Sequence, residues 1–133
     1  MKVIKPKTSK GPADRFSGNV YPTEILVGEE PSRVRIWSVH FAPGAHTAWH
    51  SHAVGQYLHI VEGTALVQER GGNIKVLKPG ETIYTPPDTE HWHGASSDSF
   101  MVHLAIWEAP ESGEESTWGE HVTDEEYNKQ PTA

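Results

Sequence analysis

The chain contains no cysteine among its 133 residues, and this absence constrains both its scaffold and its chemistry. No disulfide can hold the fold together, so the core must form by apolar packing, for which a chain of this length is large enough. Any metal site must use nitrogen and oxygen ligands, because no thiolate is available. These exclusions favour one globular domain over residues 1–133.

Positive charge and long apolar runs are also scarce. The 11 Lys and Arg residues are outnumbered by 18 Asp and Glu residues, giving a formal net charge of −7. This balance argues against a nucleic-acid binder, which needs a basic surface for phosphates. No apolar run approaches the about 20 residues that cross a bilayer, and no apolar segment follows the basic N-terminus as a secretory signal requires. We therefore expect a cytoplasmic protein without nucleic-acid or membrane partners.

Helical periodicity is nearly absent, and short alternating segments between turn residues take its place. Residues 33–41 and 100–108 alternate in polarity and are rich in β-branched and aromatic residues, which is typical of strands. Further strands are expected over seven shorter segments: 20–26, 48–52, 56–62, 64–69, 74–77, 82–85 and 91–93. Many short strands separated by turns predict an all-β sandwich or barrel.

The composition divides the chain into a central module and two ends. Residues 1–19 are rich in Pro, Gly and Lys, which predicts an extended arm. The barrel core is expected over residues 33–108. Residues 109–133 form an acidic tail, with a short helix at 123–129 that the pattern T-x-x-E would open. The acidic run 108–115 is expected to be solvated surface.

Two histidine pairs with i, i+2 spacing are the most informative feature. His50 and His52 form one pair, and His91 and His93 form the other. Alternate side chains of a strand point to one face, so each pair can direct both imidazoles to one point. Gln56 has the parity of the first pair and could add an amide oxygen. Such groups suit a borderline divalent metal; the alternative is histidines that pair with neighbours and an inward, hydrogen-bonded glutamine.

The first pair lies in a pattern that resembles the first motif of the cupin superfamily. Gly44, His50, His52, Gln56 and Gly63 stand at the spacing of that motif. The family usually has Glu where this chain has Gln56. An amide in place of a carboxylate would leave the ligand set neutral, so a bound metal would keep its full charge for polarising a substrate oxygen or stabilising an anion.

The second pair lies in a pattern that resembles the second cupin motif. Gly80, Pro86, Asp88 and His91 follow its spacing, with Asp88 where the family usually has Gly and Ala95 where it usually has Asn. The resemblance implies a single cupin β-barrel, a double-sheet jelly roll. It also implies one divalent metal per chain, for which the ligands would be the following: His50, His52, Gln56 and His91.

Shorter phrases resemble a narrower group, the bacterial manganese-dependent cupin hydroxynitrile lyases. These phrases are T-A-W-H-S-H, H-W-H-G, H-L-A-I, G-P-A-D and H-V-T-D-E-E-Y. Members of that group cleave cyanohydrins to a carbonyl compound and hydrogen cyanide, and they catalyse the reverse addition. The resemblance favours manganese, although nitrogen and oxygen ligands suit iron, nickel and zinc as well.

His103 is the candidate general base. It shares parity with Met101 and Ala105, and burial among apolar groups would lower its pKa and keep it neutral. In the lyase interpretation, His93 and Thr47 would position the leaving anion. The alternatives are that both histidines only orient a metal ligand and that Thr47 is an ordinary threonine at a strand end.

Several residues beside these candidates receive a structural or substrate-binding interpretation. The candidate substrate-binding walls, which could equally be core, are Val39, Phe41, Leu58 and Trp107. Two tryptophans of opposite parity to the ligands are expected outside the barrel: Trp49 and Trp92. Histidines without a motif position are interpreted as surface or structural: His40, His46, His59 and His121.

Three classes of function are compatible with these patterns. The first is a metal-dependent lyase acting on cyanohydrins. The second is an iron or nickel dioxygenase, or an isomerase, that uses the same ligands with positions open for oxygen or an enediolate. The third is a non-enzymatic module that binds a small molecule. In each case we expect a homodimer or larger homo-oligomer, because the strand at 33–41 and the arm offer edges that pair readily.

Overall fold

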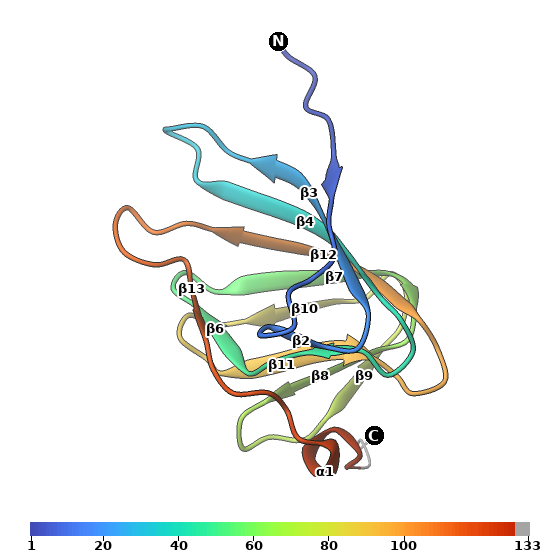
Figure 1. Cartoon of the computed structure of the whole chain (residues 1–133). Coiled ribbons are helices and arrows are strands. Elements are labelled where there is room, and N and C mark those ends of the chain that lie inside the picture. Colours follow the sequence, from blue (N-terminus) through green and yellow to red (C-terminus); the bar gives the residue numbers. More distant parts are fainter. Residues whose placement is uncertain (130–133) are drawn as a thin grey trace.

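The computed structural model describes residues 1–129, which form two antiparallel sheets and one short helix. The first sheet has the order β1 (Lys7–Thr8), β3 (Val20–Val27), β4 (Val34–Phe41), β12 (Met101–Glu108), β7 (Gln56–Gly63) and β10 (Thr82–Thr85). The second has the order β13 (Ser116–Trp118), β6 (His50–His52), β11 (His91–Ala95), β5 (His46–Thr47) and β2 (Phe16–Ser17), with β8 (Ala65–Glu69) beside β11 and β9 (Lys75–Leu77) beside β8. The sheets curl toward each other into a barrel (Figure 1), which confirms the all-β jelly-roll prediction.

The arm and the tail contribute strands that the sequence did not indicate. The predicted strand 48–52 is interrupted, because Ala48 N–H donates to the carbonyl of Arg15 (2.8 Å) and Trp49 N–H donates to that of Glu120 (3.0 Å). In the tail, β13 pairs with β6, opposite His50 and His52. The arm and tail are therefore joined by backbone hydrogen bonds to the strands that carry the first histidine pair.

The inner faces of the two sheets enclose an apolar core. Its largest fully buried members come from three strands: Phe41, Leu58, Ile60 and Met101. Alternation along β4, β7 and β12 puts these side chains on one face, as the sequence pattern predicts. Each stabilises the fold by about 1.5–3 kcal/mol through removal of apolar surface from water.

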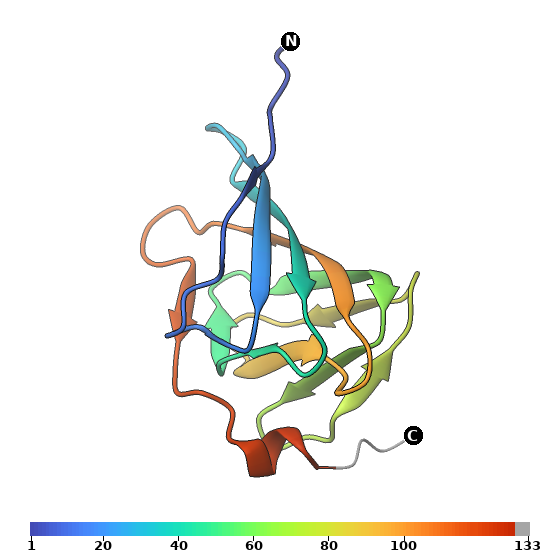
Figure 2. The same cartoon turned by 45° about the vertical axis from the view of Figure 1, so that its right-hand side comes forward.

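A second apolar cluster lies on the outer side of the second sheet. Trp49 and Trp92 do point out of the barrel, as predicted, but both are buried against Leu66, Ile74 and Val122. The tail covers them as it runs along the sheet to α1 (Asp124–Tyr127) (Figure 2). A capping box formed by the residue before α1 confirms the predicted helix start. No helix within residues 1–129 is long and apolar enough to cross a membrane.

The outer face of the six-stranded sheet keeps apolar side chains in contact with water. Ile36 and Ile106 are cross-strand neighbours on β4 and β12, and both are half-buried. Tyr57 and Tyr84 stand beside them on β7 and β10, are about half exposed, and have ring centres 4.9 Å apart. The N-terminal arm projects away from the rest of the molecule (Figure 1), and Val3 on it is 84% exposed. Apolar side chains that gather on one exposed face are typical of a contact surface.

We predict that two copies of the chain pair through this face. Ile106→Glu should shift the protein to monomers, because it places a charge in the middle of the contact. Val76→Glu is the control, since Val76 is an apolar residue on the second sheet and is 42% exposed. Light scattering at micromolar concentration measures the mass. A wild-type monomer, or a dimer unaffected by Ile106→Glu, would contradict the prediction.

Candidate metal centre and cavity

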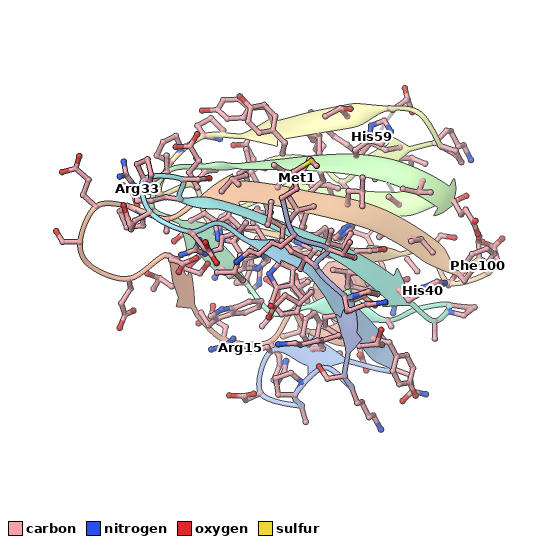
Figure 3. All side chains as sticks on the ribbon, turned by 90° about the horizontal axis from the view of Figure 1, so that it is seen from above. Met1, Arg15, Arg33, His40, His59 and Phe100 are labelled. Carbon is pink, nitrogen blue, oxygen red and sulfur yellow. The ribbon has the colours of Figure 1, made fainter. Side chains whose placement is uncertain are left out.

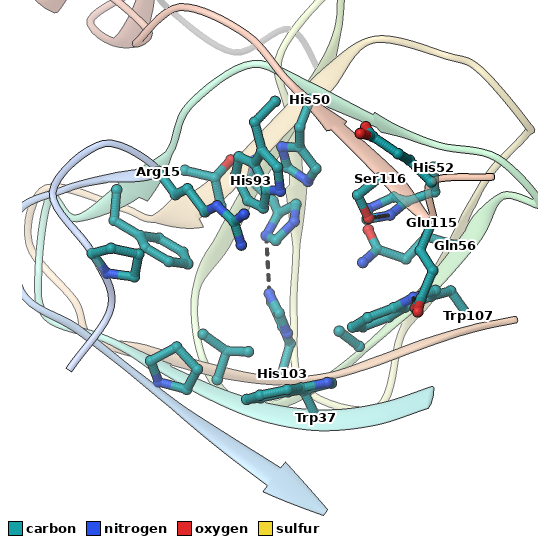
Figure 4. A pocket seen from close by; sticks show the side chains of 18 of the residues that line it. Arg15, Trp37, His50, His52, Gln56, His93, His103, Trp107, Glu115 and Ser116 are labelled. Carbon is teal, nitrogen blue, oxygen red and sulfur yellow. Dashed lines mark hydrogen bonds between the residues drawn. The ribbon is translucent and has the colours of Figure 1, made fainter. Parts of the chain in front are cut away.

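A cavity of about 790 Å³ opens between the two sheets, and Val39 and Ala105 belong both to its lining and to the apolar core. Strands β6 and β7 supply His50, His52 and Gln56 to its lining, and β11 and β12 supply His93 and His103. Its volume lies in the range of small-molecule sites. Figure 4 shows these side chains converging from opposite walls. The histidines without a motif position lie elsewhere, and Figure 3 shows two of them at the periphery: His40 and His59.

The two histidine pairs meet because β6 and β11 are neighbours in register. His50 stands directly opposite His91, and their ring centres are 4.3 Å apart. The ring centre of His52 lies 5.1 Å from that of His50. A turn between β10 and β11 sets this register, with Asp88 N–H donating to the carbonyl of His52 (2.9 Å). Asp88 has a φ of 58°, in the left-handed region where Asp is tolerated better than most residues.

Backbone carbonyls fix the orientation of two rings. Nδ1 of His50 donates to the carbonyl of Ala48 (2.8 Å), and Nδ1 of His91 donates to that of Thr89 (2.9 Å). A carbonyl only accepts, so each Nδ1 must carry the proton. Burial lowers the pKa of both histidines, and for His50 the charge of His91 lowers the pKa further. Each neutral ring therefore presents an unprotonated Nε2 to the site.

The site holds more lone pairs than donors. Nε2 of His91 faces Oε1 of Gln56 at 3.3 Å, so two acceptors meet. Nε2 of His52 and Nε2 of His93 are buried and have no hydrogen-bond partner. Whether Nε2 of His93 carries a proton follows from the direction of its hydrogen bond with His103. Burial lowers the pKa of His52 to about 3, which keeps its ring neutral. Acceptors that converge without protons are what a divalent cation requires, so the residues present fit a metal.

Three histidines that could hold a metal together are not identical to the predicted set of metal ligands. Nitrogens of His50, His91 and His93 all lie within 4.8 Å of one another. The predicted set contains His52 and Gln56 in place of His93, and both of these line the same cavity. The structure therefore brings the predicted ligands together and adds His93 beside them. This buried triad could hold a metal.

His93 and His103 form a buried pair. Nε2 of His103 lies 2.9 Å from Nδ1 of His93, so one proton joins the two rings. Burial lowers the pKa of His103 to about 4, and burial followed by the charge of His103 lowers that of His93 well below its usual range. Two neutral rings sharing one hydrogen bond have one N–H and one bare nitrogen at their outer ends. The pair can therefore take up a proton at one end and donate at the other.

The remaining predicted residues lie at different depths. Thr47 lines the cavity, and its hydroxyl accepts a hydrogen bond from His93 N–H (3.2 Å). Val39 and Trp107 are also lining residues, whereas Phe41 and Leu58 are absent from the lining and belong to the core. Phe41 packs behind the histidine pair, with its ring centre 5.2 Å from that of His103.

Glu115 corrects one expectation, because the run 108–115 is not entirely solvated surface. Its carboxylate accepts hydrogen bonds from Nε of Arg35 (3.1 Å) and Nε1 of Trp107 (3.1 Å), and it lines the cavity. A carboxylate therefore faces the cavity from the segment that follows β12. The ion pair with Arg35 offsets the charge of Glu115 at this wall.

Three further lining residues were missed by the sequence analysis. Trp37 shares the parity of Val39 on β4, so alternation could have indicated it. Arg15 and Trp118 come from the arm and tail, where no periodic signal exists. Trp118 stacks on the ring of His50 at 4.3 Å with an interplanar angle of 16°.

Comparison with known proteins places the chain in a family. Residues 37–107 match the model of the cupin domain, which covers more than half of the chain. The chain belongs to the cupin family. This cupin is 42% identical over 122 residues to the (R)-mandelonitrile lyase of Granulicella tundricola, a match covering 92% of each chain.

Solved structures agree with this assignment. A cupin-like protein from Thermotoga maritima superposes with a TM-score of 0.84 at 39% identity, covering 96% of this cupin and 95% of the other chain. A cupin-2 domain protein from Rhodospirillum rubrum gives a TM-score of 0.69 at 15% identity, covering 92% and 77%. The second likeness concerns the fold alone.

Proposed function

We propose that this cupin is a metal-dependent hydroxynitrile lyase, which cleaves cyanohydrins to an aldehyde or ketone and hydrogen cyanide and also catalyses the reverse addition. The observation that carries the proposal is the 42% identity with an (R)-mandelonitrile lyase across 92% of both chains. The cavity supports it, because the bare Nε2 nitrogens of His50 and His91 lie beside a histidine pair that can exchange a proton. The small-molecule partner would thus be a cyanohydrin.

The proposed ligands are the following residues: His50, His52, Gln56 and His91. A divalent ion bound there, with manganese favoured over iron, nickel or zinc, would polarise the substrate oxygen and stabilise an anion. All four ligands are neutral, since burial lowers the pKa of each of the three histidines. Two residues of β13 contact two of these ligands. Trp118 stacks on His50, and the Ser116 hydroxyl lies 2.8 Å from Nδ1 of His52.

The histidine pair would transfer the proton. His103 takes the hydroxyl proton of the cyanohydrin on Nδ1, its nitrogen without a hydrogen-bond partner. The carbon–oxygen double bond then forms, and the bond to the nitrile carbon breaks with its electron pair on cyanide. The proton then passes to cyanide, so hydrogen cyanide and a carbonyl compound leave a protein with unchanged protonation. With Nε2–H of His103 donating to His93, the free Nε2–H of His93 can donate to the leaving anion. Thr47 fixes the position of His93 by accepting its backbone N–H.

The lyase proposal predicts release of cyanide from mandelonitrile by the manganese-loaded protein. The rate should exceed that of metal-free protein and of buffer by more than about 100-fold, because both the metal and the base contribute. Cyanide is measured by a colorimetric assay, and benzaldehyde by its absorbance. Oxygen consumption under the same conditions is recorded in parallel. Oxygen uptake with small organic substrates and no cyanide release would instead support the dioxygenase alternative.

The ligand proposal predicts that His50→Ala/His52→Ala loses its metal. Altering groups that only support ligands costs about 10- to 100-fold in affinity, so removing two ligands should cost more than 100-fold. Elemental analysis of purified protein and a metal titration measure the loss. The matched control is His40→Ala/His59→Ala, which removes two histidines outside the cavity. A full equivalent of metal in the first variant would locate the site elsewhere.

The base proposal predicts that His103→Ala keeps its fold and metal but loses about 100- to 10,000-fold in cleavage rate. His93→Ala distinguishes the two ways in which the pair can be protonated. If His93 only orients the anion, its variant keeps the metal and loses part of the rate. If Nε2 of His93 is instead a ligand, as the triad with His50 and His91 allows, the variant also loses metal affinity. Unchanged activity in His103→Ala would remove it from the mechanism.

A further inference from the structure

Arg15 occupies a fixed position at the mouth of the cavity. Its N–H donates to the carbonyl of Pro12 (3.0 Å), and its own carbonyl accepts from Ala48 N–H (2.8 Å). The next residue, Phe16, pairs with Thr47 across β2 and β5. The backbone of Arg15 is thus attached to the strand segment that leads into His50.

The side chain of Arg15 points into the cavity (Figure 4). Its guanidinium carbon lies 5.1 Å from the ring centre of Trp118, and that ring is 4.3 Å from the ring centre of His50. The Trp118 ring thus contacts both groups and keeps the guanidinium close to the His50 ring. A single small molecule can reach both groups within a cavity of about 790 Å³.

Arg15 has no carboxylate partner within residues 1–129, although the chain contains 18 Asp and Glu residues. The other three arginines each have at least one: Arg33 with Glu111, Arg35 with Glu115, and Arg70 with Glu90, Glu120 and Glu126. A guanidinium presents a planar fork of N–H donors that matches a carboxylate. The face of Trp118 holds this fork in place without using its donors.

The opposite wall leaves this positive charge uncancelled. Glu115 lies across the cavity from Arg15 (Figure 4), and its charge is offset by Arg35 at 3.1 Å. Glu114 also lines the cavity. Both Glu114 and Arg15 are exposed to solvent, which weakens the effect of either charge on a bound anion at a distance and leaves direct hydrogen bonds as the source of selectivity. The mouth therefore carries an oriented cation on one side and a neutralised ion pair on the other.

We propose that the substrate of this cavity carries a carboxylate, and that Arg15 binds it at the mouth while the reacting carbon lies among the histidines. The second half of this statement rests on the proposed function. The carboxylate preference itself is a property of the mouth. Arg15 is thus a specificity-determining residue, and the substrate class is a carboxylated cyanohydrin or its carbonyl product.

The test compares two probes of equal size on the metal-loaded protein, 4-formylbenzoate and 4-formylbenzamide, by isothermal titration calorimetry. Aromatic probes suit the cavity because Trp37, Trp107 and Trp118 line it. The carboxylate should bind roughly tenfold more tightly, through paired charge-assisted hydrogen bonds. Arg15→Gln should abolish this preference while changing the affinity of the amide less than about twofold, because only the carboxylate uses the fork.

Two variants serve as controls. Lys10→Gln removes the same charge from an exposed position on the same arm and should keep the preference. Arg15→Lys should retain part of it, because it keeps the charge and loses the fork. Equal binding of the two probes by the wild type, or a preference that persists in Arg15→Gln, would overturn the proposal.

The outcome is separable from the lyase assay. Without cyanide release, a carboxylate preference that depends on Arg15 would still establish the mouth as an anion site, and the proposed function alone would fail. If the lyase is active, 4-carboxymandelonitrile should have a KM roughly tenfold below that of mandelonitrile, and Arg15→Gln should remove this difference at nearly unchanged kcat. A KM ratio near one in the active wild type would count against Arg15 as the carboxylate site.

Discussion

The structure depends on keeping five imidazoles neutral while they are buried together. A charged histidine in this site would have no counterion, and burying an unpaired charge is costly. The carbonyls of Ala48 and Thr89 hold the protons of His50 and His91 on Nδ1, so the bare Nε2 of both rings turns inward. The hydrogen bond between His93 and His103 satisfies one nitrogen of each ring. Proton placement on the backbone side thus creates an excess of lone pairs in the centre.

This arrangement requires support on the far side of the second sheet. All five residues of β11 are buried, which is unusual for an antiparallel strand with one side facing solvent. Trp92 alternates with His91 and His93, so an inward histidine pair forces a tryptophan outward. The tail covers it with Val122 and Tyr127, and the Tyr127 hydroxyl donates to the carbonyl of Ala95 at 2.6 Å. The tail is therefore part of what holds the histidine strand in register.

Alternation in the sequence predicts which face a side chain takes, but it does not predict depth along the barrel. His103 was correctly placed inside from its parity with Met101 and Ala105, and it is fully buried. Phe41 shares the parity of Val39, yet it does not line the cavity. It lies two residues beyond Val39, the last lining position on β4, and pairs with Met101. The sequence indicated the histidine ligands because each i, i+2 pair lies within one short strand. It did not indicate the lining residues Arg15, Glu115 and Trp118, since docking of the aperiodic arm and tail determines their positions.

This difference in origin also separates two parts of the cavity that have different roles. Regular strands build the deep part of the cavity, where His50, His93 and His103 line it and the chemistry of the donors is determined. The arm and tail build the mouth, where Arg15 stands on Trp118 opposite the ion pair of Glu115. Because Trp118 also stacks on His50, its ring contacts both the mouth and the deep part of the cavity. A substitution at Arg15 changes the charge that an entering molecule meets and leaves the nitrogen and oxygen donors untouched. Selectivity at the mouth can therefore vary while the donor set below it stays the same.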